Sequence, residues 1–199
     1  MKQEVSLKLT LFLISLFLIP AISFSQGKYL LVLDVQEQFI RDKPYEDAAG
    51  FMITNINSLI AGFEKDRILY VKSTGKSLVI NSKGFSTDTL PVPDFDPRLS
   101  IVNDNLFVKV STGDAFTSAE LMDFLRSRNA REIVITGLLA EKCITATALG
   151  GIERGFDIFL VPEAVVGKSG KTRTRAIGKL EKKGVKIIPV KEVLNPAKQ

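Results

Sequence analysis

Short apolar runs alternate with amphipathic segments along this chain, and that alternation limits the folds it can adopt. Residues 29–33 form an uninterrupted apolar run, as expected for a strand buried on both faces. Further strands are expected at residues 68–71, 106–110, 133–135, 156–161 and 185–188. Helical spacing of apolar residues predicts helices at 48–63, 118–128, 142–154 and 173–182. Helices of this length between strands favour parallel pairing. The sequence therefore predicts a Rossmann-like three-layer α/β/α sandwich with a central, mostly parallel sheet.

One segment interrupts this alternation. Residues 73–105 contain Gly84, Pro91, Pro93 and Pro97, and they are too numerous for a simple connection between two elements. Long connections in α/β folds often carry binding residues. We therefore expect this segment to be a loop excursion that lies over the functional site.

The N-terminus has the composition of a secretory signal. Lys2 and Lys8 give it a positive start, and residues 9–22 are nearly all apolar. Ser23 and Ser25 then supply small residues ahead of a cleavage point before Gln26. The sequence predicts a signal peptide over residues 1–25 and a protein that is secreted or periplasmic.

A membrane anchor is the alternative interpretation of the same residues. Thr10, Ser15 and Pro20 interrupt the apolar run, which is shorter than the roughly 20 residues that a spanning helix needs. The signal peptide is therefore favoured, with no membrane partner after cleavage. Residues 26–199 show no repeat, linker or low-complexity stretch, so a single domain is expected there.

The chain has one cysteine, Cys143, and no histidine. A disulfide within the chain is impossible, and the residues that usually bind zinc are missing, so neither a metal nor a cofactor is expected. The net charge of +5 comes largely from residues 168–191. Aromatic residues do not interleave with these charges as stacking on nucleic acid requires, so a solvated helix face is favoured and no nucleic-acid partner is expected.

Three chemically capable residues lie at the carboxyl ends of predicted strands, which is where open α/β sheets bind their ligands. They are Asp34, Lys109 and Cys143. In a chain without histidine, Asp34 can accept the thiol proton and Lys109 can stabilise a thiolate by charge. Each residue also has a structural explanation: a packed cysteine, an aspartate that caps a turn, and a solvated lysine at a strand end. The conjunction of all three favours a catalytic site.

The local sequences around these residues match a known pattern. Residues 34–39 read Asp-x-Gln-x-x-Phe, and Lys109 is followed by the pair Ala115–Phe116. Cys143 lies in the segment 137–147. In this order the motifs resemble those of the isochorismatase-like cysteine hydrolases, and together they cover most of the chain after the signal.

The resemblance implies a catalytic triad of Asp34, Lys109 and Cys143. It also implies a cis peptide bond between Leu138 and Leu139, with the backbone N–H groups of Leu139 and Cys143 directed at the developing oxyanion. Phe39 and Phe116 would bind the substrate in an apolar pocket, although ordinary core packing explains both aromatic residues equally well. The family often associates, so a homo-oligomer is possible.

The sequence also departs from the family. Nicotinamidase-type members carry a histidine-containing metal site after the second strand, and here residues 72–76 are Lys-Ser-Thr-Gly-Lys. We therefore expect an exported, metal-independent cysteine hydrolase that cleaves a small non-peptide amide or related C–N bond through a thioester-type intermediate. A catalytically silent small-molecule-binding protein on the same fold is the alternative, motivated by the bulk of Leu139. Lys76, Lys83 and Arg98 lead to a further hypothesis, that the substrate is anionic.

Overall fold

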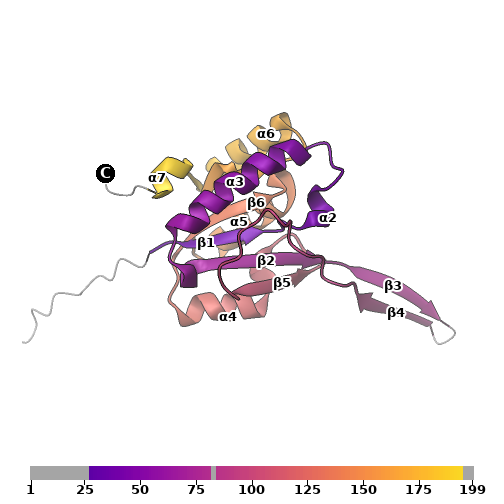
Figure 1. Ribbon diagram of the computed structural model, residues 1–199. Coiled ribbons are helices and arrows are strands. Elements are labelled where there is room, and N and C mark those ends of the chain that lie inside the picture. Colours follow the sequence, from indigo (N-terminus) through magenta and orange to yellow (C-terminus); the bar gives the residue numbers. More distant parts are fainter. Residues whose placement is uncertain (1–26, 82–83, 195–199) are drawn as a thin grey trace, which may run out of the picture.

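The computed structural model describes residues 27–81 and 84–194. Its centre is a parallel sheet of six strands in the order β5-β2-β1-β6-β7-β8 (Figure 1). These strands are β1 Tyr29–Leu33, β2 Ile68–Thr74, β5 Leu106–Val110, β6 Glu132–Leu138, β7 Asp157–Val166 and β8 Lys186–Ile187. The predicted fold class is confirmed, and each predicted strand is present: β1 and β5 have the predicted bounds, and the other four have shifted ends. From β1 the chain continues to β2 and β5 on one side of the sheet, and it then crosses to β6 on the other side of β1. Open α/β sheets form their binding crevice where the strand order changes direction in this way.

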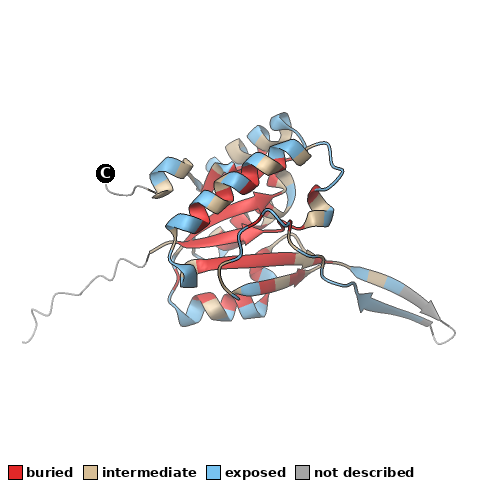
Figure 2. Ribbon diagram, viewed as in Figure 1, coloured by how far each residue is buried: buried red, intermediate tan, exposed pale blue. Residues whose placement is uncertain are grey.

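Helices cover both faces of the sheet. The core on one face includes side chains from α3 Glu46–Gly62 and α7 Val190–Leu194, and the core on the other includes α4 Ala119–Ser127, α5 Thr145–Glu153 and α6 Gly170–Glu181. Shorter helical turns are α2 Glu37–Ile40, η1 Lys65–Arg67, η2 Ala115–Thr117 and η3 Ala140–Ile144. Figure 2 shows the buried residues concentrated in the sheet and on the helix faces that touch it. The four helices predicted from the sequence, α3 to α6, each bury side chains toward the sheet, as their sequence spacing predicts.

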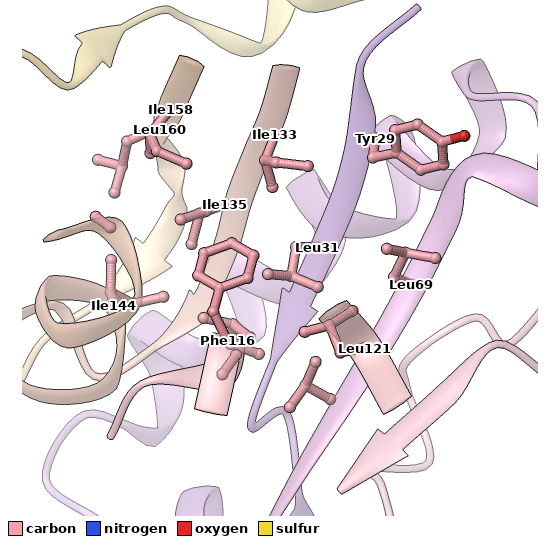
Figure 3. Close-up of a cluster of buried hydrophobic side chains, with 14 of the residues drawn as sticks. Tyr29, Leu31, Leu69, Phe116, Leu121, Ile133, Ile135, Ile144, Ile158 and Leu160 are labelled. Carbon is pink, nitrogen blue, oxygen red and sulfur yellow. The ribbon is translucent and has the colours of Figure 1, made fainter. Parts of the chain in front are cut away.

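The strands are apolar on both faces because both faces are covered. Leu30 and Val32 of β1 pack under α3, while Leu31 and Leu33 point to the opposite cluster, which Figure 3 shows with Phe116 and Leu121. Complete burial of one such side chain contributes about 1.5–3 kcal/mol relative to an exposed one. Two apolar clusters thus hold β1 at the centre of the sheet.

The expectation for residues 73–105 is wrong in part. The chain forms an antiparallel hairpin of β3 Lys76–Asn81 and β4 Gly84–Thr89, which continues outward from β2 and projects away from the body (Figure 1). Only the segment between β4 and β5, residues 90–105, runs back along the sheet. There Phe95 forms an isolated bridge with Gln36. The hairpin lacks a clean alternation of apolar and polar residues because its described side chains from 85 to 89 are exposed, so the sequence carries little strand signal.

The predicted signal peptide lies outside the described residues. Within the described part of the chain, none of the helices combines the length and the apolar character needed to cross a bilayer.

Candidate active site

Asp34 occupies a turn at the carboxyl end of β1. Its backbone has φ of 59°, a left-handed conformation that most residues avoid and that aspartate tolerates better than most. Its N–H still donates to the Val71 carbonyl of β2 at 2.9 Å, so the sheet holds the residue in place. Left-handed residues other than glycine are frequent at functional sites. Here the turn stops the strand and leaves the carboxylate at the sheet edge.

The parallel register brings Lys109 of β5 to the same edge. Ser73 of β2 lies opposite Lys109, and the Lys109 ammonium Nζ lies 2.8 Å from Oδ2 of Asp34. The side chains of Lys109 and Asp34 are 0% and 3% exposed, so the ion pair is almost completely removed from water. Such pairs are tolerated only when their remaining hydrogen-bonding capacity is used. Lys109 also donates to the Thr112 carbonyl and to Ser73, which meets this requirement.

Ser73 is a site residue that the sequence analysis did not identify. Its hydroxyl donates to Oδ1 of Asp34 at 2.7 Å and accepts from Lys109 Nζ at 2.5 Å, so it bridges the two ions. Gln36, which is completely buried, fixes the Ser73 backbone: its Oε1 accepts from the Ser73 N–H and its Nε2 donates to the Ser73 carbonyl. The predicted strand 68–71 ended three residues too early, and a longer strand would have placed Ser73 beside Lys109.

Cys143 approaches this pair from the end of β6. The chain leaves the sheet through Gly137, whose φ is 114°, and a Cβ at that position would lie 2.0 Å from the Leu33 carbonyl oxygen. Only glycine allows so close an approach to β1. The peptide bond between Leu138 and Leu139 is cis. Helical backbone begins at Ala140 and not near the predicted position 142, with a π-helical turn before α5.

The loop after Lys109 also packs against Cys143. A Cβ at Gly113 would lie 3.8 Å from the Cys143 Cα, so the backbones run close together there. Thr147 of α5 fixes this contact, since its hydroxyl accepts from the Ala115 N–H and donates to the Gly113 carbonyl. The loop that holds the Lys109 ammonium and the helix that follows Cys143 are therefore tied to each other.

The environment of Cys143 disfavours its ionised form. Burial, the negative charge of Asp34 and the hydrogen bond of Asp34 with the sulfur raise the pKa of the thiol, while Lys109 lowers it, and the net result is a pKa of about 11. The thiol is thus protonated at neutral pH in the resting protein. Glu141, two residues before Cys143, accepts from the Lys168 N–H at 3.0 Å and is not among the groups that shift the pKa of the thiol. The structure therefore gives the direction of the shift in the thiol pKa, which is upward.

Asp34→Asn is expected to speed alkylation of Cys143 by iodoacetamide below pH 10 while lowering any turnover. The substitution removes two influences that raise the thiol pKa, so the thiolate fraction at a given pH increases. Since nucleophilicity falls with pKa, labelling should rise about threefold for each unit by which the pKa drops. Labelling rates from pH 7 to 11 measure this.

Asp94→Asn is the matched control, since the Asp94 side chain is 97% exposed and does not influence the thiol. Its labelling profile should match that of the unmodified protein. A labelling rate of the unmodified protein that already levels off near pH 8 contradicts the raised pKa.

The two aromatic residues predicted to bind substrate lie in different places. Phe39 of α2 lines a cavity of about 610 Å³ that also borders Ser73. Phe116 is 2% exposed and stacks on Phe156 within the core, with ring centroids 5.1 Å apart. Phe116 therefore supports η2 and α5, and direct contact with a substrate stays a prediction. Leu139 packs against the core beneath α3.

The residues present do not suit a metal of the nicotinamidase type. Among residues 27–81 and 84–194, no three carboxylate, thiol or imidazole side chains lie close enough to hold an ion. Lys72 stands at the end of β2, where its ammonium pairs with Asp94 and lies over the Phe95 ring.

The fold is a parallel α/β sandwich that brings a carboxylate, an amine and a thiol together at one sheet edge. The model of the isochorismatase domain matches residues 28–192, and the chain belongs to this family of hydrolases.

Individual relatives are distant in sequence. The chain is 22% identical to the secreted isochorismatase effector Isc1 of Verticillium dahliae over 73% of this chain and 76% of that protein. A nicotinamidase and pyrazinamidase of Acinetobacter baumanii has the same fold, with a TM-score of 0.66, 19% identity, and coverage of 85% of this chain and 99% of that one. YcaC of Escherichia coli, an octameric hydrolase of unknown specificity, gives a TM-score of 0.58 at 17% identity, covering 85% and 78%.

Proposed function

We propose that this protein is an exported, metal-independent cysteine hydrolase that cleaves a small non-peptide amide or related C–N bond. One observation carries the proposal: a thiol lies beside a buried, fully hydrogen-bonded ion pair of a carboxylate and an ammonium. Buried ion pairs contribute little net stability, so a chain that keeps one at a sheet edge next to a nucleophile is using it for chemistry. The pair supplies both a proton acceptor and a fixed positive charge.

In the proposed reaction the Cys143 Sγ attacks the amide carbon as its proton passes to Asp34. A C–S bond forms, the C–N bond breaks, and Asp34 passes the proton to the departing amine, which leaves a thioester. Water then attacks the thioester, with Asp34 as its base, and the carboxylic acid leaves while the proton returns to sulfur. Lys109 holds the carboxylate in position throughout.

The carbonyl oxygen becomes negative during attack and needs donors. We assign this role to the backbone N–H groups of Leu139 and Cys143, in agreement with the sequence prediction. None of the hydrogen bonds recorded between described residues uses the Leu139 N–H, which leaves it available to a ligand. Neutral backbone donors suit this position because they add no charge that would oppose the proton transfer to Asp34.

The high pKa of the thiol is consistent with this sequence of steps. A protonated thiol next to an acceptor loses its proton only as the C–S bond forms, so no reactive thiolate is exposed between turnovers. In an exported protein a protonated thiol is protected, because thiolates are oxidised more readily than thiols. Export itself rests on the composition of residues 1–25, and the relative named a secreted effector is in keeping with it. A homo-oligomer likewise stays a proposal, which the octameric relative supports.

Rapid quenching tests the proposed function directly. Mixed with an excess of a reactive amide or aryl ester and quenched in acid, the protein should carry an acyl group on the peptide that contains Cys143, as seen by mass spectrometry. The acyl group should be released by hydroxylamine, which cleaves thioesters. A ligand that binds without any acylation or turnover would instead support the alternative, a catalytically silent binding protein on this fold.

A further inference from the structure

The cavity that borders Ser73 lies next to the ion pair. It has a volume of about 610 Å³, within the usual range for small-molecule sites, and its walls come from α2, the end of β2 and the base of the hairpin. The lining residues are Gln38, Phe39, Ser73, Thr74, Gly75, Leu90, Pro91 and Pro93. Because the Ser73 hydroxyl contacts both Asp34 and Lys109, this residue joins the cavity to the reacting groups.

The backbone acceptors in the cavity wall are already used by the protein. The Thr74 hydroxyl donates to the carbonyls of Leu90 and Pro91, and the Leu90 N–H donates to the Gly75 carbonyl. The Gln36 amide donates to the carbonyls of Ser73 and Pro93. A ligand therefore finds these carbonyls occupied.

The surface of the cavity wall that a ligand would contact is mainly apolar. The leucine side chain, the two proline rings and the ring of Phe39 carry no hydrogen-bonding group, and the exposed Gln38 amide lies at the rim. The cavity opens to solvent, since Leu90 is 45% exposed. A polar or charged substituent placed against this wall would lose part of its water and find few partners there, which disfavours it. An apolar substituent would gain from the same burial.

Positive charge that could attract an anion lies elsewhere. No charged residue is among the described residues of the wall, and Arg98, one of the cations considered for this purpose, is held by Asp96. Lys76 does not line the cavity, and Lys83 lies outside the described residues. The nearby ammonium groups of Lys72 and Lys109 have their own carboxylate partners. The structure thus gives no support to the anionic substrate suggested by the sequence.

We infer that this cavity binds an uncharged, apolar acyl group, an alkyl chain or ring attached to the amide carbon, and that Leu90 at the hairpin base sets this preference. The inference rests on the proposed function in one respect. The proposed reaction requires the amide group to lie toward Ser73 and Cys143, which leaves the acyl group in the cavity. It adds the class of substrate: neutral carboxamides with an apolar acyl part, rather than amides that carry a second carboxylate or an amine.

Binding to the Cys143→Ala variant tests the inference without turnover. Three amides with the same six-carbon chain serve as probes in titration calorimetry: hexanamide, the monoamide of adipic acid, and 6-aminohexanamide. Hexanamide should bind at least tenfold more tightly than either charged probe. Leu90→Lys, made in the same background, should weaken hexanamide and favour the adipic monoamide. Leu78→Lys is the matched control, because Leu78 lies on the same hairpin, is 62% exposed and does not line the cavity.

Several results would overturn the inference: equal binding of the three probes, tighter binding of a charged one, no binding of any, or equal effects of the two lysine substitutions. Failure of the proposed function has a different outcome. If the unmodified protein binds hexanamide with the expected preference but neither hydrolyses amides nor forms an acyl-enzyme, the cavity assignment stands and the hydrolase proposal fails.

Discussion

Cys143→Ala is expected to lower kcat for amide hydrolysis by about 10⁴-fold or more, because the variant cannot form the covalent intermediate. The fold should be unaffected, since Cys143 is only partly buried and alanine removes a single atom. Turnover of an amide substrate and the denaturation midpoint of the same sample measure the two quantities. Loss of turnover at unchanged stability separates a missing nucleophile from a damaged structure.

Ser73→Ala supplies the comparison that makes this result decisive. The Ser73 hydroxyl also contacts Asp34 and Lys109, so it is the other candidate nucleophile at the ion pair. If Cys143 is the nucleophile, Ser73→Ala keeps acylation on the cysteine peptide and reduces the rate only through the loss of one hydrogen bond to Asp34. Unchanged hydrolysis in Cys143→Ala, together with its loss in Ser73→Ala, would transfer the role to the serine.

Lys109→Met is expected to lower the free energy of unfolding by about 3–5 kcal/mol, because it leaves the Asp34 carboxylate buried without its counter-charge. Turnover should fall as well, since the carboxylate loses the group that orients it. Denaturant titration gives the stability, and the same preparation gives the rate. The effect is large for one substitution because both side chains of the pair are almost completely buried.

Two controls identify the cause. Lys186→Met removes a surface partner of Asp157, whose side chains are half exposed, and should cost less than about 1 kcal/mol. The double variant Asp34→Asn with Lys109→Met should be more stable than Lys109→Met alone, since no charge is then left unpaired. A double variant that is less stable than either single variant would contradict this account.

Much of the fold could be predicted from the sequence because strands buried on both faces need continuous apolar runs. Residues 29–33 and 106–110 were predicted with the observed bounds. The hairpin of β3 and β4 was missed, because a two-stranded arm with exposed faces buries too little to impose an alternating pattern. Element ends were also shifted: β7 extends to Val166, five residues beyond the prediction of 156–161.

The sequence by itself determined which chemistry is available to this protein. One thiol, no histidine, and an aspartate and a lysine at strand ends leave a carboxylate or an amine to activate the thiol and exclude an imidazole. Those facts depend only on which residues are present and on their order along alternating elements. They also carried the resemblance to the family, which the match over residues 28–192 confirmed.

Only the tertiary structure decided how these groups act on one another. The bridging position of Ser73, the complete burial of the Asp34–Lys109 pair and the raised pKa of Cys143 depend on distances between β1, β2, β5 and η3, which no local pattern encodes. Electrostatic interactions vary steeply with separation and burial, so their sign at a given atom requires coordinates. The apolar wall at the hairpin base arises in the same way, from residues far apart in the chain that the fold brings together.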